Sequence, residues 1–154
     1  LVTLVAIALV DKVGRKPLLL TGSAGMAITL ALMAWCFSQA TGSGNSLTLP
    51  APWGPVALVA ANIYVVCFGV SWGPVVWVLL GEMFPNRIRA IALAVAAAAQ
   101  WLANFVITST FPALAEIGLI FAYGLYAAFA VLSLVFVWRN VRETKGMELE
   151  AMTD

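Results

Sequence analysis

The sequence is short of charged side chains and contains no histidine. Charged residues make up 10% of its 154 residues, against roughly 25% in soluble domains, which excludes a soluble enzyme and a disordered tail. The lack of histidine excludes histidine metal sites and serine–histidine catalysis. With no paired central acid and no cluster of metal ligands either, we expect no enzyme, no metal site and no cofactor. The net charge of +1 gives no sign of a nucleic-acid partner, and we expect none.

Cysteine is also scarce, whereas apolar residues are unusually frequent. The two cysteines, Cys36 and Cys67, lie in apolar runs and are expected to be small buried hydrophobes without a disulfide. No charged residue lies between Lys16 and Glu82, and 63% of the chain is hydrophobic. A helix of roughly 20 apolar residues crosses a bilayer core. We therefore predict an all-α membrane protein.

The uncharged stretches divide the chain into one partial helix and four whole ones. Residues 1–10 are apolar but too short to span a bilayer, so we expect the chain to be a fragment that begins inside a membrane helix. A loop is expected at 11–17, four membrane helices within 18–139, and a polar tail at 140–154. The four helices are predicted at 18–39, 55–81, 88–111 and 119–139.

The basic residues all lie in alternate connections between these helices. They are Lys12, Arg15, Lys16, Arg87, Arg89, Arg139, Arg142 and Lys145. The loops at 41–53 and 112–118 have none. Cytoplasmic loops carry an excess of lysine and arginine. We therefore predict that the loop at 11–17, the turn at 85–89 and the tail at 140–154 are cytoplasmic.

The predicted helices at 55–81 and 88–111 carry residues that could bind a ligand. Gly73 and Pro74 interrupt the first of them, and interrupted helices often mark the substrate site of a transporter. Trp77, one turn further on, could offer a flat apolar face to a sugar, although residue type alone favours a packing or lipid-facing tryptophan. Gln100 and Asn104 share one face of the next helix and could bind hydroxyl groups, or equally bond to a neighbouring helix.

Charged residues at helix ends on the predicted cytoplasmic side form a second candidate group. Acids and bases at such depth normally pair, so these side chains could close one side of the protein as a gate, or could instead be solvated helix ends. The residues of this candidate gate are Asp11, Arg15, Glu82, Arg89 and Glu143. No carboxylate lies near the middle of any predicted helix, so a proton-coupling acid is expected outside this chain.

Four short motifs follow one another along the chain. Residues 11–16 read D-K-V-G-R-K, residues 73–89 carry G-P-x-x-W-x-x-x-x-E-x-F-P-x-x-x-R, residues 100–105 read Q-W-L-A-N-F, and residues 143–146 read E-T-K-G. Together they resemble the motifs of the sugar porters of the major facilitator superfamily. The second and third are most similar to those of bacterial D-xylose–proton symporters. The resemblance covers essentially the whole chain.

The resemblance implies the C-terminal part of a twelve-helix transporter, from the end of helix 8 through helices 9–12. In that family the sugar lies between two helix bundles. The positions that match its surroundings are Trp77, Gln100 and Trp101, with Gly73 and Asn104 close by and Phe68 where it can line the site. The positions that match the cytoplasmic salt-bridge cluster of the inner gate are Arg15, Glu82 and Arg89.

The function that the resemblance implies is transport of a pentose or hexose, such as xylose or glucose, by alternating access. It further implies proton symport in the full-length protein, and a multi-pass position in the lipid bilayer of a bacterial plasma membrane with a cytoplasmic C-terminus. Three alternatives stay open: an uncoupled sugar facilitator, a sugar sensor that does not transport, and a truncated remnant. Arg142 replaces the proline that precedes E-T-K-G in the family, so we expect the last helix to continue into the tail.

Overall fold

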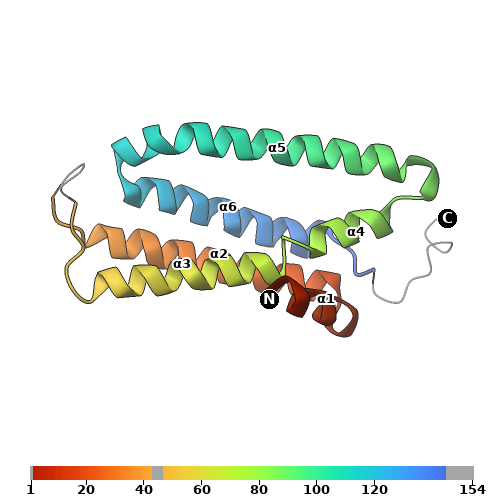
Figure 1. Ribbon diagram of the computed structural model, residues 1–154, viewed down its shortest axis with the longest axis horizontal. Helices are drawn as coiled ribbons and strands as arrows, with labels where there is room; N and C mark the ends of the chain where they lie inside the picture. Colours follow the sequence, from red (N-terminus) through yellow and green to blue (C-terminus); the bar gives the residue numbers. More distant parts are fainter. Residues whose placement is uncertain (1, 43–46, 145–154) are drawn as a thin grey trace.

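The computed structural model is built almost entirely of helices (Figure 1). It describes residues 2–42 and 47–144, without the side chains at 2–5, 7 and 11. The elements are α1 (Val2–Val13), α2 (Arg15–Ser38), α3 (Trp53–Val70), α4 (Val75–Met83), α5 (Asn86–Ile117) and α6 (Leu119–Asn140). Four segments are long and apolar enough to cross a membrane, and they correspond to α2, to α3 with α4, to α5 and to α6. This confirms the predicted all-α class and the number of long apolar helices.

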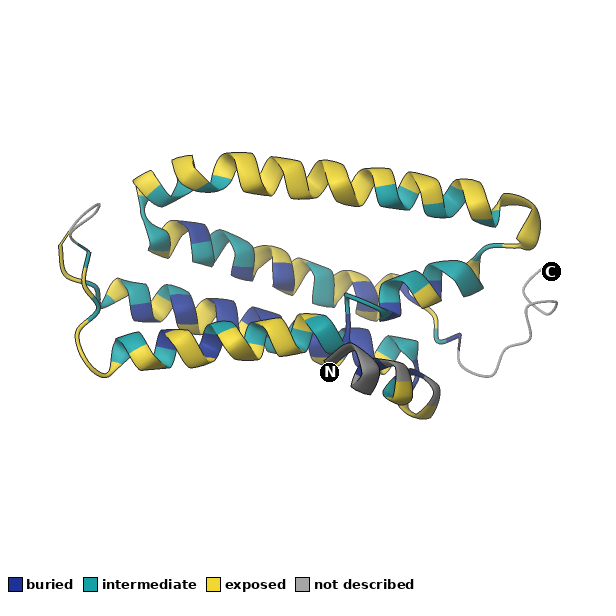
Figure 2. Cartoon of the chain, in the orientation of Figure 1, coloured by how far each residue is buried: buried dark blue, intermediate teal, exposed yellow. Residues whose placement is uncertain are grey.

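The helices are packed unevenly around α2. That helix contacts α3 on one side and α6 on the other, and it contributes Leu18, Leu19, Met26 and Leu30 to the buried core. α5 lies beyond α6, against α6 and α4 (Figure 1). None of its described residues is buried, and Figure 2 shows it exposed along almost its whole length. One long apolar helix therefore offers most of its surface to whatever surrounds this chain.

The helix ends differ from the predicted ones at both ends of the bundle. α1 and α2 are separated by Gly14 alone, whose φ of 104° suits glycine, so the turn is shorter than the loop expected at 11–17. α5 runs through Pro112 to Ile117, where a loop was expected at 112–118. Proline removes only one helical hydrogen bond, and stacking of the neighbouring Phe111 on Tyr126 of α6 holds this turn in place.

The two cysteines are free, as expected, although Cys67 is only partly buried.

The last helix does not continue into the tail, so the expectation drawn from Arg142 is wrong. α6 ends at Asn140, and Val141 has an extended backbone with φ −86° and ψ 125°. The reason lies in the contacts that follow. The Val141 side chain is buried in the core, and Glu143 and Thr144 bond to groups on α2 and α4. These contacts draw the chain back across the end of the bundle.

The close approach of α2 and α3 depends on glycine. A Cβ added to Gly22 would collide with the side chain of Ser71, and one added to Gly25 would lie 2.5 Å from Cys67 Sγ. Small residues allow membrane helices to approach closely enough for van der Waals packing to hold them together.

Replacing Gly22 with alanine should therefore destabilise the protein. We expect a loss of about 1–3 kcal/mol, the usual cost of overpacking, seen as a lower melting temperature of the purified protein in detergent. Gly124→Ala on α6 is the matched control, because an added Cβ there meets no atom within 4 Å. Equal melting temperatures for Gly22→Ala and the unmodified protein would contradict this packing.

Candidate functional site

The break between α3 and α4 is a turn with its own hydrogen bonds. The amides of Ser71 and Gly73 both donate to the Phe68 carbonyl, at 3.2 and 2.9 Å. In a continuous helix the Ser71 amide would instead bond to the Cys67 carbonyl. The Ser71 hydroxyl takes over that bond at 2.6 Å. The break predicted at Gly73 and Pro74 is thus present, and a serine side chain satisfies a carbonyl that the break leaves without its helical partner.

The break and α4 hold three of the predicted sugar-site residues. Phe68 lies in the last turn of α3 and is 43% exposed. Gly73 lies in the break itself, and Trp77 lies in the first turn of α4; both are half-buried. α4 points its two buried residues, Val75 and Leu79, into the core. Trp77 is therefore attached to a short helix that is anchored on its opposite side.

The other three predicted sugar-site residues lie on α5. Gln100, Trp101 and Asn104 are all exposed, Trp101 by 74%. Gln100 and Asn104 are one turn apart on one face, as expected. Among the described residues neither of their side chains has a hydrogen-bond partner, so bonding to a neighbouring helix is not seen in this part of the fold. The two amides are free to bind a polar group from outside the chain.

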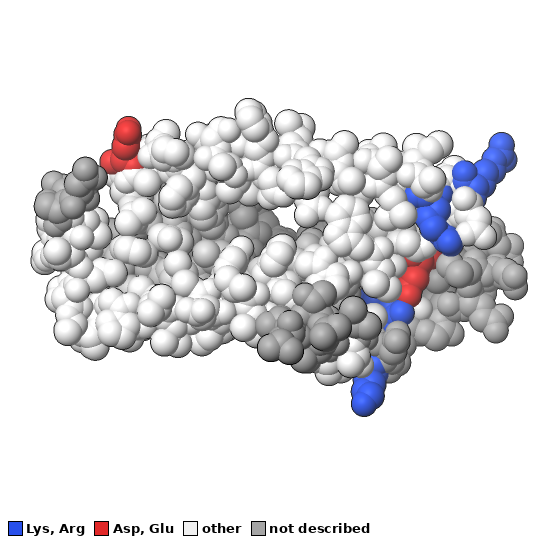
Figure 3. Space-filling model, viewed as in Figure 1, with Lys and Arg blue, Asp and Glu red and all other residues white. Residues whose placement is uncertain are grey.

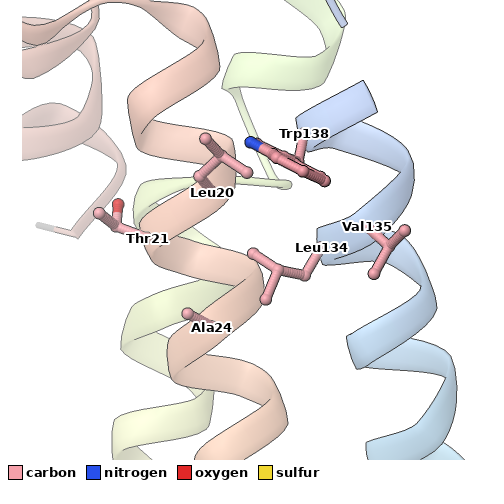
Figure 4. A pocket seen from close by; sticks show the side chains of 6 residues that line it. All are labelled: Leu20, Thr21, Ala24, Leu134, Val135 and Trp138. Carbon is pink, nitrogen blue, oxygen red and sulfur yellow. The ribbon is translucent and has the colours of Figure 1, made fainter. Parts of the chain in front are cut away.

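None of the six predicted sugar-site residues lines either of two grooves that lie between the packed helices. One groove, of about 450 Å³, lies between α2 and α6 and is lined mainly by apolar side chains (Figure 4). Its lining is Leu20, Thr21, Ala24, Leu134, Val135 and Trp138. The second, of similar volume, lies between α2 and α3. Within the described residues the sugar-site candidates are exposed or half-buried positions on α3, the break, α4 and α5, and neither groove encloses them.

Three of the five charged candidates, Arg15, Glu82 and Glu143, come together at one end of the molecule, where Figure 3 shows basic and acidic side chains together. Arg15 and Glu82 form a bidentate ion pair, with Nη2 to Oε1 at 2.6 Å and Nε to Oε2 at 3.0 Å. The Arg15 and Glu82 side chains are 11% and 25% exposed. Thr144 Oγ1 also donates to Glu82 Oε2, at 2.6 Å. Glu82 thus joins the start of α2, the end of α4 and the segment after α6.

Glu143 binds the start of α2 through backbone groups. Its two carboxylate oxygens accept hydrogen bonds from the amides of Arg15 and Lys16 at 3.0 and 3.1 Å. The first amides of a helix lack internal partners, and the helix dipole favours a negative charge there. Gly14 leaves room for this carboxylate, because an added Cβ would lie 2.7 Å from Glu143 Oε2. The tail after α6 therefore caps a helix far from it in sequence.

Two members of the predicted gate lie outside this arrangement. Arg89 donates to the Phe84 carbonyl at 3.1 Å, and within the described part of the chain it has no ion pair. The side chain of Asp11 lies outside the described residues. Thr144 was not predicted. Thr144 is the second residue of the E-T-K-G motif, so the sequence did mark this position. Its hydroxyl carries no charge, however, and therefore did not suggest Glu82 as a partner.

The comparisons with known proteins agree on one family. A family model described as "Sugar (and other) transporter" matches residues 1–154. The chain belongs to this family. It is 60% identical over 153 residues to the glucose transport protein of Synechocystis, covering 99% of this chain and 33% of that protein. It is 45% identical over 157 residues to the D-xylose-proton symporter of Escherichia coli, covering 97% and 30%.

Solved structures show the same fold. The inward-open xylose transporter XylE of Escherichia coli matches with a TM-score of 0.81 at 46% identity, covering 98% of this chain and 32% of that one. Another XylE structure is described as a major facilitator superfamily symporter and matches with the same TM-score. The fold predicted from the motifs is confirmed, and the chain is a multi-pass membrane protein. It spans about a third of the length of these relatives.

Proposed function

We propose that the full-length protein containing this chain transports a monosaccharide across the membrane by alternating access. The observation that carries the proposal is the match to the sugar transporter family over all of residues 1–154. Identity to the Synechocystis glucose transport protein exceeds identity to the D-xylose-proton symporter, 60% against 45%, so we expect glucose to be the better substrate and xylose the second.

Half-buried Trp77 on α4 and the exposed amides on α5 support a role for these two helices as one wall of the sugar site. The Trp77 ring would lie against the apolar face of the sugar, while the free amides of Gln100 and Asn104 would bond to its hydroxyls. Trp101 and Phe68 would add apolar surface, and Gly73 would let the sugar approach the backbone of the break. The remaining two thirds of the family fold would supply the opposite wall.

The ion pair of Arg15 and Glu82 supports a role as a gate. Together with Thr144 and Glu143 it ties three segments at one end of the bundle, and separating them would open that end. Arg89, which has no ion pair within the described part of the chain, would join the gate through segments outside that part, and Asp11 stays a proposed member. We infer that this end, with the loop at 11–17 and the tail at 140–154, faces the cytoplasm of a bacterium whose plasma membrane holds the protein.

Coupling to protons would depend on the rest of the protein. Within the described helices every charged residue lies near a helix end, so the coupling acid would lie outside this chain. An uncoupled facilitator is the second candidate. The relative described as the glucose facilitated diffusion protein of Zymomonas mobilis, at 38% identity, favours it.

Uptake by the full-length protein in liposomes tests the proposal. Labelled glucose and xylose would be supplied with and without an inward proton gradient. We expect uptake of glucose, with accumulation above the outside concentration only when the gradient is present. Equilibration without accumulation would make the protein a facilitator. Uptake of neither sugar would contradict transport and favour the sensor or the remnant.

A further inference from the structure

A polar contact inside the apolar bundle joins the break between α3 and α4 to two other helices. Trp72 Nε1 donates to Ser23 Oγ on α2 at 2.7 Å. Ser133 Oγ on α6 lies 3.3 Å from the same oxygen. Ser23 has no exposed surface. A polar group buried in a membrane protein costs free energy unless it is paired, so these three side chains hold one another in place.

Two consecutive residues of α2 contact two consecutive residues at the start of the break. Gly22 leaves the space that Ser71 fills, and Ser23, next in sequence, accepts the hydrogen bond of Trp72. Ser71 is fully buried. The two residues that begin the break, Ser71 and Trp72, therefore both contact α2, immediately before Gly73 and Pro74.

The contacts of Ser71 and Trp72 with α2 fix the position at which α4 begins. α4 has only nine residues, and its far end is held by the ion pair of Glu82 with Arg15. Trp77 lies between these two attachments, five positions after Trp72. A shift of the break along α2 would therefore move Trp77 relative to the amides on α5, without any change in Trp77 itself.

We propose that Trp72 and Ser23 are positioning residues whose hydrogen bond sets the start of α4 and thereby places Trp77 for sugar binding. The proposal rests on the proposed function, since it concerns the same sugar site. It assigns a role to two residues that lie outside the four motifs and bond to each other inside the bundle.

The test is equilibrium binding of labelled glucose to the purified full-length protein. Trp72→Phe keeps a large ring and removes only the N–H donor, while Ser23→Ala removes the acceptor. We expect either change to raise the Kd roughly threefold to tenfold, the usual worth of one hydrogen bond. The double variant should resemble the single ones, because both remove the same bond. Trp35→Phe is the control, because its side chain is 60% exposed on α2.

A cycle with Trp77→Ala separates positioning from a general structural role. When Trp77 is absent its placement no longer matters, so Trp72→Phe should then leave the Kd unchanged. An unchanged Kd for both single variants, or the same rise with and without Trp77, would overturn the positioning role while glucose binding by the unmodified protein still supports the proposed function. If the unmodified protein binds neither glucose nor xylose, both proposals fail.

Discussion

Replacing Gln100 with alanine in the full-length protein should weaken sugar binding by about tenfold to a hundredfold. A side-chain amide both donates to and accepts from sugar hydroxyls, and its loss leaves these hydroxyls without partners in a site closed to water, at about 1.5–3 kcal/mol. The stability of the protein should change little. Gln100 is exposed on α5 and has no side-chain hydrogen-bond partner in the described part of the chain, so no hydrogen bond within that part is lost.

The combination of weak binding and unchanged stability distinguishes a ligand-binding residue from a packing residue. Both quantities can be measured on one preparation, by equilibrium binding of labelled glucose and by thermal unfolding in detergent. Asn62→Ala is a suitable control, because within the described residues this exposed amide on α3 bonds only to the Leu58 carbonyl of its own helix, at 2.8 Å. Unchanged affinity in Gln100→Ala would remove this residue from the sugar site.

Replacing Glu82 with alanine should lower the rate of sugar uptake about tenfold or more while changing equilibrium sugar affinity less. The substitution removes two hydrogen bonds from Arg15 and one from Thr144. Hydrogen bonds to charged groups contribute about 1.5–3 kcal/mol each, and the 25% exposure of the Glu82 side chain favours the lower end. A loss of about 1.4 kcal/mol from one state shifts a two-state equilibrium tenfold, here toward the state with this end open.

The measurement is the initial rate of glucose uptake into liposomes at saturating sugar, beside equilibrium binding to the same variant. Glu116→Ala provides the control, since this exposed acid lies in the last turn of α5, at the opposite end of the bundle. Uptake by Glu82→Ala at the unmodified rate would show that the ion pair does not take part in opening and closing.

Those parts of the fold that depend on strong local signals could be predicted from the sequence. The absence of charge between Lys16 and Glu82 defines the long apolar helices, and Gly73 with Pro74 marks the break. Charge also indicated the cluster at one end, where Arg15 and Glu82 do pair. Charged residues are rare in membrane helices, and a Gly-Pro pair interrupts helical hydrogen bonding, so each of these features has a strong local signal.

The remaining features depend on contacts between residues that are common in such helices. Ser23 and Trp72 lie in apolar runs and resemble ordinary packing residues until the fold brings them within 2.7 Å. Thr144 has no charge to suggest its bond to Glu82. The placement of Gln100 relative to Trp77 could not be predicted either, because it depends on how α5 packs against α4 and on the part of the family fold outside this chain.

The most direct test of the central claim is a structure of the full-length protein with glucose bound. The account predicts that the sugar lies against the Trp77 ring and that the Gln100 amide is within hydrogen-bonding distance, about 2.7–3.2 Å, of a hydroxyl. It also predicts that Trp72 Nε1 donates its hydrogen bond to Ser23 Oγ in the same complex. A sugar bound elsewhere, with neither Trp77 nor Gln100 in contact with it, would contradict the account.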